Sequence, residues 1–132
     1  MIERSRFDVS VPLVDDLGIE LLESVPGQVV TFLRVLPRHT NSAQVAHGGA
    51  IMTLLDVTMA MAARSTAENP LKVRTATVEM KTTFMRAGAG LLTCTGVTVH
   101  RTRSLCFCEA EIRDESGGLV ARGSGTFKPF PR

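Results

Sequence analysis

The chain has 132 residues, a length typical of one domain, and its 44% hydrophobic and 21% charged residues are a globular balance. A net charge of +2 is too small to indicate a surface for nucleic acid or an anionic membrane, although it permits a local anion site. Trp and Tyr, on which bases and sugars usually stack, are both absent. We therefore expect a single domain over residues 1–132 that binds neither nucleic acid nor membrane.

The N-terminal half predicts a hairpin followed by a long helix. Residues 11–17, with Pro12 near the first position, predict one or two helical turns. Extended runs at 19–24 and 28–36 flank the turn-forming pair Pro26-Gly27. After a polar stretch, residues 49–66 are rich in Ala, Met and Leu and end before Pro70, which predicts the long helix. Because this helix is apolar nearly all round, we expect it to be enclosed.

The C-terminal half predicts antiparallel strands. Apolar and polar residues alternate through 78–84, 106–113 and 119–128, which predicts three strands. Turns are expected at 87–90, 102–103 and 116–117, and the segment between the first two turns is the fourth strand. A two-residue turn at 116–117 would set Glu111 opposite Arg122 as a charge pair. The segment Gly123-Ser124-Gly125 lacks a phosphate-loop motif and predicts a closely packed strand. The sum is an α+β domain with one helix against one sheet.

The cysteines and the N-terminal residues indicate in which cellular compartment we expect the protein. Cys94, Cys106 and Cys108 are odd in number and form no C-x-x-C motif, which favours a reducing cytoplasm. With His100 they lack zinc spacing, so we expect core thiols and no metal site. No signal peptide is visible in the first ten residues, and the longest apolar stretch, 50–63, is too short for a membrane span.

Asp56 is the most unusual residue of the predicted helix. At 100° per residue it shares a face with small or apolar residues only: Gly49, Met52, Met59, Ala60 and Ala63. A carboxylate there is costly unless it is paired or opens onto a wet cleft. It is either a functional acid or a structural one that is bonded to the backbone or a threonine.

The start of the helix offers a second candidate feature. Gly48 and Gly49 would expose the free amides of the first turn to a ligand, as an oxyanion hole requires, or would merely permit a tight turn. His47 is either a general base or a cap of the loop. Asn41 can hold a water molecule or a carbonyl, or can form a turn.

Residues 41–56, NSAQVAHGGAIMTLLD, resemble the hotdog-fold acyl-CoA thioesterases of the phenylacetic-acid-degradation (PaaI-like) type. The likeness extends to VRTATVEM at 73–80 and VARGSGTF at 120–127. It implies a long central helix wrapped by an antiparallel sheet of about five to six strands. It also implies dimers, commonly paired into tetramers, that hydrolyse an acyl-CoA at the dimer interface without a cofactor.

The resemblance assigns roles to the matching residues. Gly48 would donate its amide to the thioester carbonyl, Asn41 would hold that carbonyl or the water, and Asp56 would act as general base or nucleophile. Thr77 stands where the family often has Ser or Thr, and would place the water. His47 is the remaining expected catalytic residue. Gly49 and Met52 are expected beside the substrate, and Arg86, Arg101 and Arg103 near the CoA phosphates. Relatives often have Gly at position 102, where this chain has Thr102.

Helix geometry constrains how these residues can work together. Gly48 and Asp56 are eight residues apart, which is about 12 Å along a helix. A carbonyl at the Gly48 amide is therefore out of reach of the same chain's Asp56, so one site needs two subunits. Two alternatives remain: a hotdog hydratase or dehydratase acting on the acyl carbons, and a non-catalytic acyl-CoA-binding domain.

Overall fold

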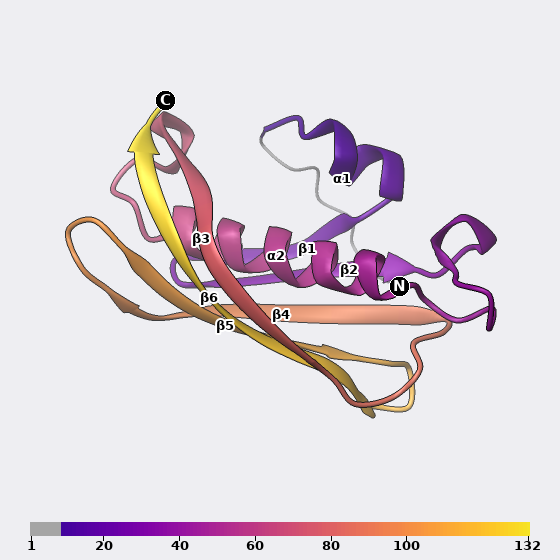
Figure 1. Cartoon of the computed structure of the whole chain (residues 1–132). Helices are drawn as coiled ribbons and strands as arrows, with labels where there is room; N and C mark the ends of the chain where they lie inside the picture. The colour runs from indigo at the N-terminus through magenta and orange to yellow at the C-terminus, as the bar shows by residue number, and fades with distance from the viewer. Residues whose placement is uncertain (1–8) are drawn as a thin grey trace.

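The computed structural model describes residues 9–132 and is shown in Figure 1. The elements in chain order are α1 (Pro12–Leu17), β1 (Glu20–Val25), β2 (Gln28–Arg34), a 3-10 turn (Pro37–His39), α2 (Gly48–Ser65), a second 3-10 turn (Pro70–Lys72), β3 (Val73–Phe84), β4 (Leu91–Arg101), β5 (Cys106–Arg113) and β6 (Leu119–Pro131). Every predicted helix and strand is confirmed. The main difference is β3, which begins at Val73 rather than near Val78.

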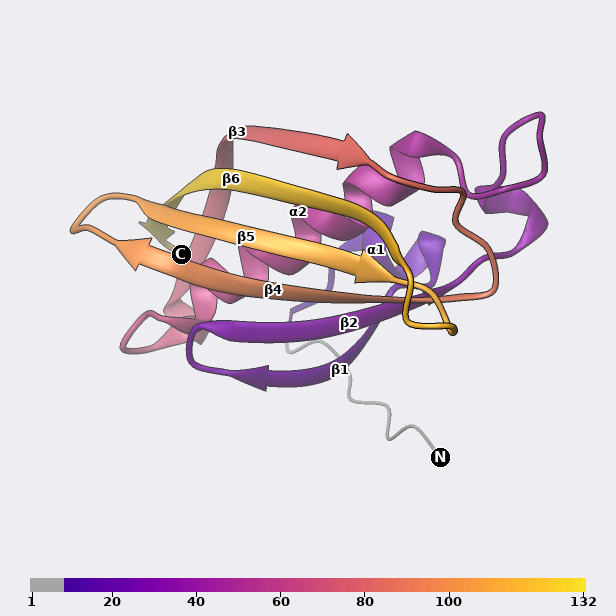
Figure 2. The ribbon, with the colours of Figure 1, turned by 90° about the horizontal axis from the view of Figure 1, so that it is seen from below.

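All six strands form one antiparallel sheet in the order β1-β2-β4-β5-β6-β3. The sheet curves around α2, while α1 lies on the other side of α2 from β4 and β5 (Figures 1 and 2). β3 pairs with β6 and forms one edge of the sheet. This arrangement confirms the expected hotdog architecture, with its long helix wrapped by the sheet.

One face of α2 is held tightly against the middle of the sheet. Leu54, Leu55 and Met59 are fully buried there. Thr58 shares a 2.7 Å hydrogen bond with Thr31 of β2, and Gly96 of β4 leaves room for the Thr58 backbone. On the side where α1 lies, Val57, Ala60 and Met61 are partly buried, and Met52 near the helix start is 40% exposed. The expected enclosure of the helix therefore holds except near its start.

The C-terminal strands have the predicted register. Glu111 lies opposite Arg122, although its carboxylate accepts a 3.0 Å bond from Arg113 instead. Gly123 is closely packed as expected, since a Cβ there would lie 3.1 Å from the Lys81 carbonyl oxygen. Gly125 approaches the Glu79 carbonyl oxygen in the same way, also at 3.1 Å. Glycines on β6 thus let β3 and β6 pack closely.

The three cysteines are free and buried, which confirms the expectation of core thiols. Burial raises the pKa of the Cys94 thiol to about 12, although hydrogen bonds with Thr58 and Thr31 act in the opposite direction. Among residues 9–132 no cluster of His, Cys, Asp and Glu could hold a metal ion. Within the same residues no helix is both long and apolar enough to cross a bilayer.

We predict that Gly96→Ala lowers the free energy of unfolding by about 1–3 kcal/mol, because α2 and β4 leave no spare room at this position. The new Cβ would lie 3.0 Å from both Cγ2 and the carbonyl oxygen of Thr58. Urea unfolding measures the change. Gly48→Ala is the matched control, since a Cβ there meets nothing closer than 3.5 Å. Equal losses in the two variants would contradict the close approach of α2 to β4.

We also predict that the native protein at pH 8 does not react with a thiol reagent such as DTNB. The thiolate is the reactive form, and burial keeps Cys94 protonated and covered while it also encloses Cys106 and Cys108. Denaturation should release three reactive thiols per chain. Rapid labelling of the folded protein would show that the strands around these thiols open readily.

Candidate functional site

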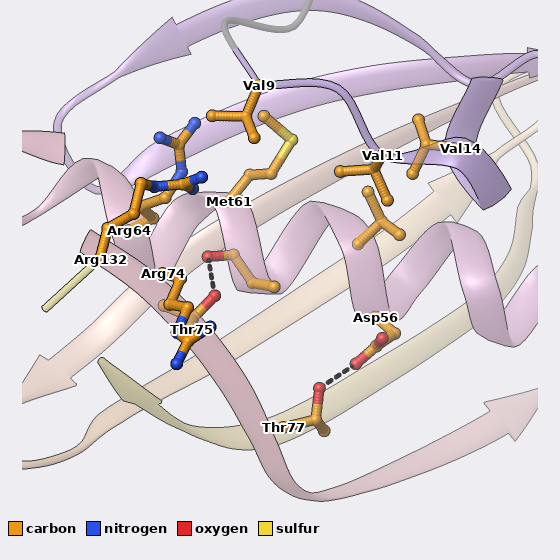
Figure 3. A pocket seen from close by; sticks show the side chains of 12 residues that line it. Val9, Val11, Val14, Asp56, Met61, Arg64, Arg74, Thr75, Thr77 and Arg132 are labelled. Atoms are coloured by element: carbon orange, nitrogen blue, oxygen red, sulfur yellow. Dashed lines mark hydrogen bonds between the residues drawn. The ribbon is translucent and has the colours of Figure 1, made fainter. Parts of the chain in front are cut away.

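Asp56 and Thr77 form the polar centre of the candidate site. Asp56 projects from the middle of α2 toward β3, where the Thr77 hydroxyl donates a 2.6 Å hydrogen bond to its Oδ1 (Figure 3). Both the structural and the functional interpretations of Asp56 allow this threonine partner. The other carboxylate oxygen, Oδ2, has no hydrogen bond within residues 9–132, so it can accept a proton from a bound molecule.

Asp56 and Thr77 lie on a cavity of about 250 Å³. The cavity runs along α2, between the segment around α1 and the first half of β3 (Figure 3). Its apolar walls include Val11, Val14 and Met61. A carboxylate in the middle of a helix is tolerated without an ion pair when it opens onto a cavity, as Asp56 does.

The first turn of α2 holds one amide that is bonded and one that is not. His47 is the N-cap residue, and its Nδ1 accepts a 2.8 Å bond from the Gly49 amide. The Gly49 amide is therefore occupied. Among the described residues no acceptor bonds the Gly48 amide, which keeps it available to a ligand oxygen. The ring of Phe84 lies beside Gly48, 3.5 Å from where a Cβ would stand.

Asn41 shapes the loop before α2. Its side-chain oxygen accepts bonds from the backbone amides of Ala43 and Val45, at 2.9 and 3.4 Å. This is the turn-forming role that the sequence allowed. The side-chain NH₂ forms no hydrogen bond with residues 9–132, so Asn41 can still donate to a carbonyl but can no longer easily accept.

The two halves of the expected site do not meet within one chain. Asn41, His47 and Gly48 lie at the start of α2, and none of them lines the cavity that contains Asp56. Gly48 and Asp56 remain eight residues apart on an unbroken helix, a separation of about 12 Å. Met52, between them on α2, is also outside the cavity.

The three arginines expected near CoA phosphates lie at two ends of the sheet. Arg86 follows β3 and contacts Asp114 at 3.4 Å. Hydrogen bonds from Ser116 are the main reason that the pKa of Asp114 is lowered, with smaller contributions from Gly118 and Arg86. Arg101 donates to the Thr66 hydroxyl at the other end, and Arg103 follows in the exposed β4–β5 turn. One phosphate cannot contact all three in a single chain.

Sequence reasoning missed the cationic end of the cavity, where Arg64 and Arg132 lie (Figure 3). A signal for Arg64 was present, because Asp56, Ala60 and Arg64 follow one another at four-residue steps along one face of the helix. Arg132 carried no such signal, because a residue at the end of β6 reaches the helix only through the sheet.

Comparisons with known proteins identify the family. The thioesterase superfamily matches residues 43–121. The chain belongs to the thioesterase superfamily. It is similar to human acyl-coenzyme A thioesterase 13, at 30% identity over 82% of this chain and 77% of the relative. It also resembles the solved structure of a conserved protein from Pseudomonas aeruginosa, with 30% identity and a TM-score of 0.85 over 92% of this chain and 95% of that one.

A third similarity concerns the fold alone. The PaaI protein of the E. coli phenylacetic acid degradation operon superposes with a TM-score of 0.82. The alignment covers 89% of this chain and 83% of that protein, at 23% identity. The superfamily match at residues 43–121 confirms the resemblance inferred from residues 41–56, and this superposition confirms the hotdog fold.

We predict that His47→Ala lowers the free energy of unfolding by about 1 kcal/mol, because the Gly49 amide loses its N-cap acceptor. His47→Asn should restore stability, since Asn is a good N-cap. Thermal unfolding and thioester hydrolysis are measured on both variants. Retained hydrolysis in His47→Asn would establish a capping role, whereas a stable but inactive His47→Asn protein would identify His47 as a general base.

Proposed function

We propose that the protein is an acyl-CoA thioesterase that hydrolyses an acyl- or aryl-acyl-CoA to the free acid and CoA. The observation that carries the proposal is the Asp56–Thr77 pair on a cavity, with one carboxylate oxygen unoccupied. The unbonded Gly48 amide supplies the complementary donor. The similarity to human acyl-coenzyme A thioesterase 13 supports an acyl-CoA substrate.

The proposed reaction needs no cofactor. The Gly48 amide donates to the thioester carbonyl oxygen and stabilises the negative charge that develops there. Because Thr77 occupies Oδ1 of Asp56, Oδ2 faces the water and removes its proton as that water attacks the carbonyl carbon. The tetrahedral intermediate then expels the CoA thiolate, which takes the proton from Asp56. Asn41 steadies the carbonyl or the water through its NH₂ group.

Two copies of the chain would build each site. The edge strand β3 has 12 residues, and the side chains of its own Val78 and Phe84 are more than half exposed. Long exposed edges of this kind are normally covered. A two-fold axis between Met80 and Lys81 would pair two β3 strands antiparallel and set Phe84 opposite the partner's Thr77. Since Phe84 adjoins Gly48, this pairing brings the Gly48 amide to the partner's Asp56.

We infer that residues 1–132 form one domain. Two copies make the smallest working unit, and dimers pair into a homotetramer. Three free cysteines support a reducing compartment, the cytoplasm. The remaining alternatives give different outcomes in one assay: a hydratase adds water to an enoyl-CoA without releasing thiol, and a binding domain holds acyl-CoA without turnover.

We predict that Asp56→Ala lowers kcat for thiol release by about 10²–10⁴, as expected for loss of a general base. The assay follows free CoA from a panel of short, long and aromatic acyl-CoAs. Asp56→Asn keeps the Thr77 contact but cannot accept the proton, so it should be equally inactive. Thr77→Ala should retain more activity than either. Wild-type turnover in a folded Asp56→Asn protein would exclude the assigned role.

The shared site is tested by complementation between subunits. Gly48→Pro removes the amide proton while keeping the helix start, because proline is accepted at the first helical position and His47 already has extended backbone angles. Gly48→Pro and Asp56→Ala homo-oligomers should each be inactive. Mixed oligomers should recover about a quarter of wild-type activity, since random pairing restores one site in each heterodimer. An inactive mixture would contradict a site built from two chains.

A further inference from the structure

The cavity beside Asp56 has one face of α2 as its floor, and the middle residue of that floor is small. Asp56, Ala60 and Arg64 follow one another at four-residue steps, so their side chains point the same way, about 6 Å apart along the helix. All three line the cavity. Because Ala60 projects only a methyl group, the space over it stays open from the acid to the arginine.

The side walls of this stretch are apolar. Val57 and Met61 supply methyl and methylene groups from α2, and Val14 supplies them from α1 (Figure 3). The hydroxyl of Thr75 also lines this part, but it donates to the Ala60 carbonyl at 3.3 Å (Figure 3). Such walls suit a hydrocarbon chain and offer little to the amide groups of pantetheine. The acyl part of the substrate, rather than its CoA part, fits this stretch.

The size of the cavity limits the acyl group in two ways that agree. A cavity of about 150 Å³ holds benzene, so the cavity of about 250 Å³ beside Asp56 holds about ten carbon atoms. From Asp56 to Arg64 the floor measures about 12 Å, which an extended chain covers in about ten bonds. Arg64 is only 9% exposed and donates from Nη1 to the Pro70 carbonyl at 3.0 Å, so the apolar stretch ends at a side chain that is held in place.

We propose that this cavity receives an apolar acyl group of up to about ten carbon atoms, and that Ala60 is the residue that keeps it open to this length. The inference rests on the proposed thioesterase function and names its substrate class. Ala60 lies about 6 Å along the helix from Asp56, which corresponds to about five bonds of the chain. A larger side chain at this position closes the cavity beyond that point and leaves the reacting carbonyl untouched.

The test measures kcat/KM for straight-chain acyl-CoAs from acetyl-CoA to tetradecanoyl-CoA. In the wild type we expect a rise of about twofold to fourfold for each added methylene up to about ten carbons. Longer chains should gain nothing more, because their last carbons meet no further apolar wall. Ala60→Leu should lower kcat/KM for octanoyl-CoA by about tenfold or more, mainly through KM, while acetyl-CoA and butyryl-CoA change by less than about twofold.

Two further variants make the test specific. Ala89→Leu is the matched control, because it makes the same change at an exposed position between β3 and β4, and its chain-length profile should equal that of the wild type. Ala60→Val adds less volume than Ala60→Leu and tests the proposal even if the leucine variant does not fold. Its loss should be smaller and again confined to chains longer than about five carbons.

A wild-type kcat/KM that does not depend on chain length, or that keeps rising well past ten carbons, would overturn the proposal, as would a wild-type profile in both Ala60 variants. If Ala60→Leu weakens acetyl-CoA as much as octanoyl-CoA, the cavity holds the CoA part and the proposal is wrong. If no acyl-CoA is hydrolysed, the proposed function fails instead. Calorimetric binding of octanoate then still decides the inference, because equal affinities in the wild type and Ala60→Leu would contradict it.

Discussion

The packing of Thr58 against the sheet sets the rotation of α2 and therefore the direction in which Asp56 points. Thr58 bonds Thr31 on β2 and sits against Gly96 on β4, where no side chain would fit. This fixes both the height of α2 above the sheet and its rotation about its own axis. Asp56 precedes Thr58 by two residues, which is about 200° around the helix, so it must point away from that contact and toward β3. The carboxylate reaches Thr77 because Thr58 is buried.

The same unbroken helix separates the two chemical halves of the site. A free amide is available only in the first turn of a helix, where no earlier carbonyl can accept from it. An acid on the third turn lies on the same rigid rod and cannot be brought closer by any movement of side chains. In the proposed dimer, pairing two antiparallel helices through β3 would resolve this conflict, because each helix start would then face the middle of the other.

Local patterns in the sequence determined most of the secondary structure. Alternation with period two located the strands and the Glu111–Arg122 register, because it depends only on residues close in sequence. The turn itself differs from the predicted one at 116–117: it is centred on Glu115 and Ser116, and the register shifts between Ile112 and Arg113. The long helix and its end before Pro70 follow from the same kind of local rule. The residues themselves had already singled out Asp56 and the helix start, and the resemblance of residues 41–56 added the family and the roles of these residues.

Other features were decided only by the tertiary structure. The pairing of β3 with β6 joins segments that local rules cannot connect, and it places Arg132 beside a helix that ends at Ser65. The sequence left His47 open as base or cap, and only the fold showed its ring accepting from the Gly49 amide. The sequence by itself determined one helix, one sheet and an acid on the helix. Tertiary packing decided that this acid opens onto a cavity with arginines at its far end, because distant residues meet only through strand order and helix rotation.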